Sequence, residues 1–346
     1  MPIVSRPKHA ASGLLRFLSA ILFVGSAGCG AAEGESEPDE LLERARGSFD
    51  VLEPVPEEAL DAPDIVLGQH LFWDERISSD GTTSCASCHT VESWGADRRR
   101  LSVDARGELT ARHSQTVFNS MEQPSIRWLG DRTDGAHQAE RSITGSMGLD
   151  GEEALTPLLL EHGYEELFWR AFPDDPDPVS ATNYGQAIQA YQSTLVTPAP
   201  FDDFLGGDTE ALTSDQRAGL ELFIQNGCVA CHSGALLGGG SMQRFGIAED
   251  YWIHTGSEEI DEGLYAVTQE ESDRYLFRTP MLRNVAKTGP YFHDGSVDTL
   301  EDAVRIMSRV QFGRELSDED VVRITSFLES LTGEIPPNYG PPESPE

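Results

Sequence analysis

The chain has 346 residues, of which 59 are acidic and 25 basic, so its formal net charge is −34 and its pI is near 4.4. A protein this acidic is not expected to bind nucleic acid, because the phosphate backbone attracts basic surfaces. The composition, 38% hydrophobic and 24% charged, is globular, and the length predicts about two domains. Five cysteines are too few for a disulfide scaffold in a chain of this length, so each needs its own explanation.

The first 28 residues have the features of a bacterial export signal. They contain three basic residues and no acidic one, and their apolar stretch, 14–24, is shorter than the roughly 20 residues that cross a bilayer. The following Ser26-Ala27-Gly28-Cys29 resembles a lipobox, although Ser26 stands where leucine is usual. We therefore expect a signal peptide over 1–28 and a periplasmic protein, either lipid-anchored through Cys29 or cleaved and free.

Both ends of the remaining chain look unstructured, and its charge is extreme. Residues 29–50 are rich in Glu, Gly, Ser and Pro, which predicts a flexible tether, and 335–346 predict a disordered tail. Without the signal peptide, 22 basic residues face 59 acidic ones, a net charge of −37. Such a surface either serves solubility or steers a basic redox partner in a salt-dependent way, and charge alone does not decide between the two.

Two short motifs account for four of the five cysteines. Cys85 and Cys88 precede His89, and Cys228 and Cys231 precede His232, both as C-x-x-C-H. This spacing lets two thiols form thioethers to a haem while the adjacent histidine reaches the iron. A zinc ribbon would place its cysteine pairs roughly 15 to 20 residues apart, and a thioredoxin-like pair does not require the histidine. We therefore predict covalently bound haem c at both motifs.

The chain between the tether and the tail is expected to be mainly helical, with two cytochrome c-like domains. Apolar periodicity and capping residues predict helices over 64–73, 152–171, 180–195, 213–226, 298–310 and 317–331. A Pro-rich stretch, 197–207, looks like a linker between the two haem motifs. The expected domains are 51–197, with the first haem, and 198–334, with the second.

At this point the sequence resembles the bacterial di-haem cytochrome c peroxidase family from about residue 67 to 333. The resembling segments around the two motifs are 67–74 (LGQHLFWD), 78–81 (SSDG), 219–223 (GLELF), 282–285 (LRNV), 289–295 (GPYFHDG) and 299–304 (TLEDAV). The resemblance implies a peroxidatic haem in the N-terminal domain and an electron-transfer haem in the C-terminal one. It further implies reduction of hydrogen peroxide to water with electrons from a small cytochrome or copper protein, and pairing as a homodimer.

The resemblance assigns Met307 as the axial ligand opposite His232. A thioether favours ferrous iron and raises the reduction potential. A related branch that oxidises a protein tryptophan has tyrosine at this position, so methionine favours the peroxidase branch. Read without the resemblance, Met307 would be a core residue on the apolar face of its helix.

The first haem site departs from the family pattern. Sixteen residues after His89 the family has a second histidine that caps the resting ferric iron, but this chain has Ala105. We therefore expect an iron held by His89 alone, with no need for reductive activation. His113 is either a replacement cap or a hydrogen-bonded surface or interdomain histidine. In the family, an asparagine at the position of His113 binds calcium. The resemblance assigns the two other protein ligands of that ion, both backbone carbonyls, to Thr288 and Pro290. Calcium prefers oxygen ligands, so imidazole is a poor exchange for the asparagine.

The resemblance also points to residues that handle peroxide and electrons. Gln138 matches a catalytic glutamine, and Trp128 matches a tryptophan that bridges the two haems. The family glutamate that completes the proton transfer falls at or near Gly148, and the sequence offers no basis for choosing among nearby substitutes: Glu140, Asp150 and Glu152. Gln138 could instead be an ordinary exposed amide, and Trp128 could be core packing.

Two further functions stay open because of the missing carboxylate. One is oxidation of an organic or protein substrate at the same open site, and the other is a di-haem electron carrier without peroxidase chemistry. Turnover with peroxide and a reduced donor separates the peroxidase from the carrier.

Overall fold

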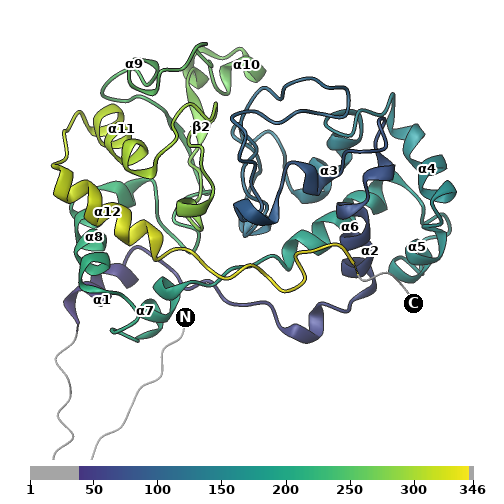
Figure 1. The fold of residues 1–346 in the computed structure, drawn as a ribbon, viewed down its shortest axis with the longest axis horizontal. Helices are drawn as coiled ribbons and strands as arrows, with labels where there is room; N and C mark the ends of the chain where they lie inside the picture. Colours follow the sequence, from purple (N-terminus) through teal and green to yellow (C-terminus); the bar gives the residue numbers. More distant parts are fainter. Residues whose placement is uncertain (1–38, 343–346) are drawn as a thin grey trace, which may run out of the picture. The chain divides into compact units, whose positions relative to one another are not determined.

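The computed structural model describes residues 39–342, and this part of the chain is mainly helical (Figure 1). The predicted signal peptide and Cys29 lie outside the described residues, as do the last four residues of the tail. Within 39–342, no helix combines the length and apolar character needed to cross a bilayer.

The first haem motif is surrounded by helices α2 to α6, which are Pro63–Trp73, Gly135–Thr144, Leu155–Glu161, Glu165–Ala171 and Ala181–Ser193. Helices α2 and α3 both pack on α6, and the buried side chains between them form one apolar cluster. Gly68 allows the closest of these contacts, because a Cβ at this position would lie 1.9 Å from the Ala187 carbonyl oxygen. This part of the structure holds Cys85 next to α2.

The second haem motif is surrounded by α7, α8, α11 and α12, which are Pro200–Gly206, Ser214–Gln225, Leu300–Phe312 and Asp318–Glu329. Helix α8 packs on α12, and Gly219 permits the same close contact, since a Cβ there would lie 1.9 Å from the Arg323 carbonyl oxygen. Short helices α9 (Trp252–Thr255) and α10 (Tyr265–Thr268) lie in the loop between strands β1 (Met242–Arg244) and β2 (Leu276–Arg278). These strands pair antiparallel, with Met242 opposite Arg278.

The expectation of a mainly helical chain is confirmed, and five predicted helices agree with the structure to within two residues at each end. The helix predicted over 152–171 is wrong as a single element. It is broken into α4 and α5 at Gly163, whose φ of +80° is a left-handed conformation that ends α4. The predicted linker, 197–207, contains helix α7, which buries Phe201 and Phe204.

The two ends of the described chain are ordered, contrary to the prediction. Helix α1 (Glu40–Arg46) lies in the predicted tether and packs on α7 and α8, because Leu41, Leu42 and Ala45 bury themselves in the second cluster. The predicted disordered tail is wrong for residues 335–342, since Tyr339 is 5% exposed and belongs to the apolar cluster around the first motif. Each cluster therefore includes side chains from the far end of the sequence.

Candidate haem sites and the region between them

The first motif orients its histidine through the backbone. Cys85 opens a 3₁₀ turn, Cys85–Ser87, and the Ser84 amide donates a hydrogen bond to the Ser87 hydroxyl (2.9 Å). Nδ1 of His89 lies 2.8 Å from the Gly95 carbonyl oxygen. Burial lowers the pKa of His89, so the ring is neutral, Nδ1 donates its proton to the carbonyl, and Nε2 is left to bind iron.

The second motif repeats this arrangement. Its turn, Cys228–Ala230, begins after Gly227, whose φ of +84° is a left-handed conformation. Nδ1 of His232 lies 3.0 Å from the Leu237 carbonyl oxygen, and burial again lowers the pKa of the ring. Both histidines therefore present Nε2 in the neutral form that ligates iron.

Burial raises the pKa of all four motif cysteines. Burial raises the pKa of Cys85 to about 12 and that of Cys228 to about 11. A reactive thioredoxin-like cysteine would have a lowered pKa instead. Residues 39–342 hold no group of three His, Cys, Asp or Glu side chains that could bind a metal ion, so a zinc ribbon has no support either.

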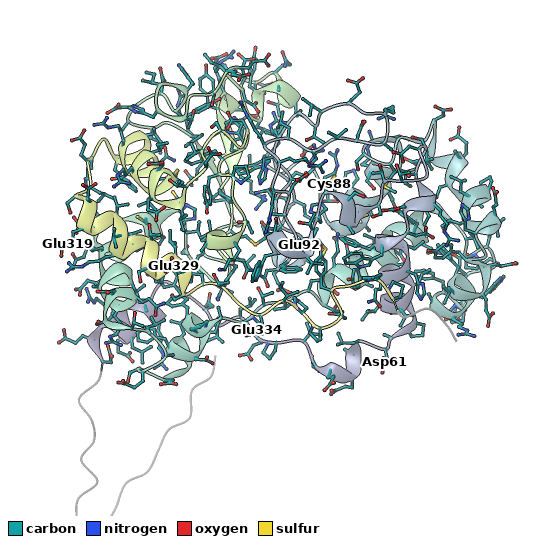
Figure 2. The ribbon with its side chains drawn as sticks, viewed as in Figure 1. Asp61, Cys88, Glu92, Glu319, Glu329 and Glu334 are labelled. Atoms are coloured by element: carbon teal, nitrogen blue, oxygen red, sulfur yellow. The ribbon has the colours of Figure 1, made fainter. Side chains whose placement is uncertain are left out.

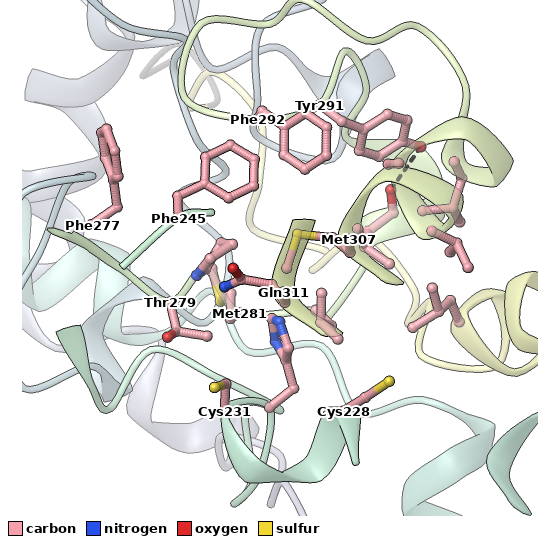
Figure 3. A pocket seen from close by; sticks show the side chains of 18 of the residues that line it. Cys228, Cys231, Phe245, Phe277, Thr279, Met281, Tyr291, Phe292, Met307 and Gln311 are labelled. Atoms are coloured by element: carbon pink, nitrogen blue, oxygen red, sulfur yellow. Dashed lines mark hydrogen bonds between the residues drawn. The ribbon is translucent and has the colours of Figure 1, made fainter. Parts of the chain in front are cut away.

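A largely apolar cavity lies over the second motif (Figure 3). His232 and Met307 both line it, and Met307 enters from α11 on the side away from Cys228 and Cys231. Much of the remaining wall is aromatic: Phe223, Phe245, Phe277, Tyr291 and Phe292. An apolar, aromatic wall suits a porphyrin, and the cavity brings together the two side chains that the sequence assigned to the second iron.

Two of the positions where the sequence departs from the family, Ala105 and Gly148, lie side by side. A Cβ built on Gly148 would be 3.2 Å from Cβ of Ala105 and 2.4 Å from Oγ of Ser79, and the Ala105 amide donates to the Ser146 carbonyl (2.9 Å). Gly148 has a φ of +74°, which disfavours any side chain at this position. The places of the capping histidine and of the catalytic glutamate are thus neighbours, and both lack a polar side chain.

Gln138 lies on α3, a helix that the sequence analysis did not predict. Its Oε1 is buried and, within the part of the chain described, has no hydrogen-bond partner, which marks a place for a ligand or water. Glu140 is half-buried, and burial together with Glu152 raises its pKa, but residues two apart on a helix do not face the same way. Asp150 and Glu152 are exposed. The structure therefore gives Gln138 no carboxylate partner on its own helix face.

Trp128 and His113 lie together between the two halves. Nε1 of Trp128 donates to the His113 carbonyl (2.9 Å), and both residues line the cavity that contains His232. Nδ1 of His113 lies 3.2 Å from the Arg99 carbonyl oxygen, and the ring is 5% exposed. This placement agrees with the interdomain alternative for His113. Thr288 and Pro290, the predicted calcium ligands, also line this cavity, and their role as ligands stays a prediction.

The sequence analysis missed two buried residues of this region. Arg278 lies at the end of β2 and lines the cavity over the second haem motif. Tyr339 donates a hydrogen bond from its hydroxyl to the His89 carbonyl (2.5 Å). Neither residue stands in a motif, and only the fold brings them to the haem sites.

Exposed acidic side chains occur in both halves of the described chain. Figure 2 labels examples from across the chain, all of them exposed: Asp61, Glu92, Glu319, Glu329 and Glu334. A basic protein approaching either half would meet negative charge.

Comparison with protein families gives two adjoining matches. Residues 62–210 match a family model described as di-haem cytochrome c peroxidase, and residues 216–332 match a cytochrome c model. Together they imply haem c in both halves.

Among curated proteins, a cytochrome c551 peroxidase of Pseudomonas aeruginosa is 38% identical over 334 residues, covering 92% of this chain and 94% of the relative. A cytochrome c551 peroxidase of Nitrosomonas europaea is 37% identical over 78% of this chain and 80% of its own. The methylamine utilization protein MauG of Methylophilus methylotrophus is 31% identical over 77% and 82%. The solved structure of a MauG-like protein associated with microbial copper homeostasis has a TM-score of 0.72, with 25% identity over 85% of this chain and 97% of that one.

Proposed function

We propose that this protein reduces hydrogen peroxide to water with electrons from a small periplasmic redox protein. The chain belongs to the di-haem cytochrome c peroxidase family and is an oxidoreductase. The observation that carries the proposal is the difference between the two sites. His232 shares a cavity with the thioether of Met307, whereas the position at which the family has a capping histidine is Ala105, which lies beside Gly148 and has no atom that binds iron. A closed site suits electron transfer, and an open one suits a substrate.

In this proposal the chain holds two covalent haems. Cys85 and Cys88 form thioethers at the first site, with His89 as the axial ligand; Cys228 and Cys231 do so at the second, with His232 and Met307 as ligands. Haem c, when bound, supplies an iron that stores and passes electrons and cleaves the O–O bond of peroxide.

Gln138 is the residue we assign to peroxide. Its side-chain amide donates through Nε2 and accepts through Oε1, and Oε1 is the buried atom left without a partner among residues 39–342. The amide orients the peroxide and stabilises charge on its oxygen, but it does not shuttle a proton as a carboxylate does. A water molecule next to Ser79, the polar side chain closest to Gly148, would have to move the proton.

Trp128 is the residue we assign to electron transfer between the halves. Its ring lines the cavity over the second haem motif, and its indole N–H donates a hydrogen bond to the carbonyl of His113, a residue of the N-terminal half. The exposed acidic side chains favour a basic donor, and the rate of donor oxidation should fall as salt screens the attraction.

Location, calcium and pairing extend the proposal. A signal peptide over 1–28 with a lipid on Cys29 would place the protein in the periplasm. Calcium would take its oxygen ligands from the Thr288 and Pro290 carbonyls, and two copies of the chain would pair as a homodimer. Mass spectrometry of the intact protein tests for the lipid, metal analysis tests for calcium, and sedimentation tests for the homodimer.

The decisive experiment mixes the oxidised full-length holoprotein with hydrogen peroxide and a reduced donor. We expect a high-spin first haem at rest and donor oxidation without prior reduction. Met307→Leu, which keeps the volume and removes the sulfur, should change the spectrum of the second haem and not of the first. A protein that carries both haems and cycles electrons but consumes no peroxide would establish the electron carrier instead.

The oxidase alternative is favoured by one specific observation, the kinship with a methylamine utilization protein. It predicts that peroxide drives oxidation of an organic or protein substrate in the absence of any redox-protein donor. Peroxide consumption that depends strictly on such a donor would exclude it.

A further inference from the structure

Arg278 is a buried cation whose contacts are all uncharged. The residue is 2% exposed, and its guanidinium reaches from the C-terminal half into the N-terminal one. Nε donates to the Arg127 carbonyl (2.7 Å), Nη1 donates to Oε1 of Gln123, and Nη2 donates to Oε1 of Gln115 (2.8 Å). These acceptors satisfy three donors but do not balance the charge.

A second buried arginine shows what a balanced site looks like in the same protein. Arg283 is 1% exposed, and its guanidinium makes two bonds to the Asp202 carboxylate, from Nη1 to Oδ2 (2.5 Å) and from Nη2 to Oδ1 (2.8 Å). Within residues 39–342 no ion pair joins Arg278 to a carboxylate. Burial lowers the pKa of Arg278 to about 10, which leaves the group charged at neutral pH. A buried charge of this kind is costly unless an anion accompanies it.

The position of Arg278 says where such an anion would lie. Arg278 lines the cavity that contains His232 and Met307, together with the polar residues Gln115 and Thr279. A guanidinium has five N–H donors, so two remain beyond the three that the protein accepts. They are available to an anion inside the cavity.

We propose that Arg278 binds a propionate carboxylate of the haem attached at Cys228 and Cys231. This inference rests on the proposed function, because it takes a haem at that motif as its ligand. A planar guanidinium matches a carboxylate, and the propionates are the anionic groups of a haem. The partner that Asp202 supplies to Arg283 is, for Arg278, supplied by the cofactor.

Two consequences follow for the bound state. Neutralising a propionate removes negative charge near the iron, so Arg278 favours the ferrous form of the second haem. The pair also connects the two sites, since the Gln115 side chain accepts from Arg278 while its backbone carbonyl lies near the ring of His89.

The test compares the holoprotein with Arg278→Gln and Arg278→Lys, using the midpoint potential of the second haem. We expect the equilibrium constant for reducing this haem to fall about tenfold in the glutamine variant, with the lysine variant in between. Gln123→Leu is the matched control, because it removes a hydrogen bond between the halves but keeps the guanidinium. An unchanged potential in Arg278→Gln, or an equal fall in Gln123→Leu, would overturn the inference.

A spectroscopic measurement covers the case in which Arg278→Gln does not fold. The propionate bending band of the second haem, seen by resonance Raman, should shift between wild type and Arg278→Lys, because one ammonium replaces a two-pronged donor. An unshifted band contradicts the inference. A wild-type protein without haem at Cys228 and Cys231 would contradict the proposed function itself, and haem staining with peptide mass analysis detects that separately.

Discussion

The near side of each haem site, which carries the motif histidine, is built alike in the two halves. The far side, where a second iron ligand would stand, differs. In each half a glycine on the helix before the haem motif, α2 or α8, lets that helix touch a later one. A phenylalanine one turn after this glycine faces the motif histidine. The ring centroids of Phe72 and His89 lie 6.4 Å apart, as do those of Phe223 and His232. In each, Nδ1 is held by a carbonyl a few residues later. In one half Met307 lines the cavity over His232, and in the other the position at which the family has a capping histidine is Ala105, beside Gly148.

This contrast shows where the division of labour resides. The parts that hold a haem are shared, and the parts that decide whether its iron is closed or open come from loops and from one helix, α11. Changing the far side should therefore change chemistry without changing haem content, while changing the near side should change stability.

The largest expected effect comes from closing the open site. Ala105→His places an imidazole where the first iron is expected to be free, and we predict that peroxide turnover by the oxidised enzyme falls about 100-fold, or ~2.7 kcal/mol in barrier. Stopped-flow spectra should show a low-spin first haem. Ala105→Val adds bulk without a ligand and should leave the haem high-spin; low-spin iron already present in the wild type would refute the open site.

Filling the glycine contacts should destabilise both halves alike. Gly68→Ala and Gly219→Ala each put a methyl group 1.9 Å from a helix carbonyl oxygen, so each should lower the free energy of unfolding by about 2–3 kcal/mol. Chemical denaturation of the holoprotein measures this loss. Gly206→Ala is the control, because nothing lies within 4 Å of its built Cβ. A loss in one half alone would break the symmetry described above.

A smaller effect is expected at the ion pair between the halves. Nε and Nη2 of Arg112 donate to the Asp261 carboxylate at 2.6 and 2.8 Å. Burial alone would raise the pKa of Asp261, but the hydrogen bonds and charge of Arg112 outweigh it and lower the pKa overall. Because the folded pKa is the lower one, the pair stabilises the fold above pH ~4 and this contribution is lost as the pH falls through the folded value.

We expect Asp261→Asn to lower the free energy of unfolding by about 1–2 kcal/mol at pH 7 and by less at pH 3. Urea denaturation at the two pH values checks the sign. Asp302→Asn breaks an exposed pair with Arg305 (3.8 Å) and should cost under about 0.5 kcal/mol at either pH. An equal loss for Asp261→Asn at both pH values would argue against the pair.

The smallest effect concerns a bond present at the first site. Tyr339→Phe removes the hydroxyl that donates to the His89 carbonyl and keeps the ring, which packs on Phe118 with centroids 4.6 Å apart. We expect a loss of about 1 kcal/mol in stability and a shifted iron–histidine band for the first haem only. Tyr339→Leu, which also removes the ring, should cost more. A Tyr339→Phe variant with the stability and iron–histidine band of the wild type would deny the hydroxyl a role.

The sequence predicts what depends on short spacing. Both haem motifs, and the helix after the Thr213 and Gln216 capping pair, could be identified because each signal lies within a few residues. Helix α3 was missed because its Gly135–Thr144 sequence is polar overall and its buried face consists of Gly135, Ala139 and Ile143, of which only the isoleucine is a large apolar residue. Arg278 was missed for another reason: its uncharged surroundings come from residues more than 150 positions away.

The exchange of chain ends between the two apolar clusters bears on how the molecule is made. Tyr339 follows the whole second half along the chain, so the core around His89 lacks one of its rings until that half has been synthesised. In the second cluster the order is reversed, because Leu41 and Leu42 are synthesised before the other residues of that cluster. A fragment ended at residue 197 would have neither Tyr339 nor the Gly333 carbonyl that accepts from Trp94 (3.0 Å). The half around His89 is therefore not a separable module, and its pocket is complete only after the second half has been synthesised.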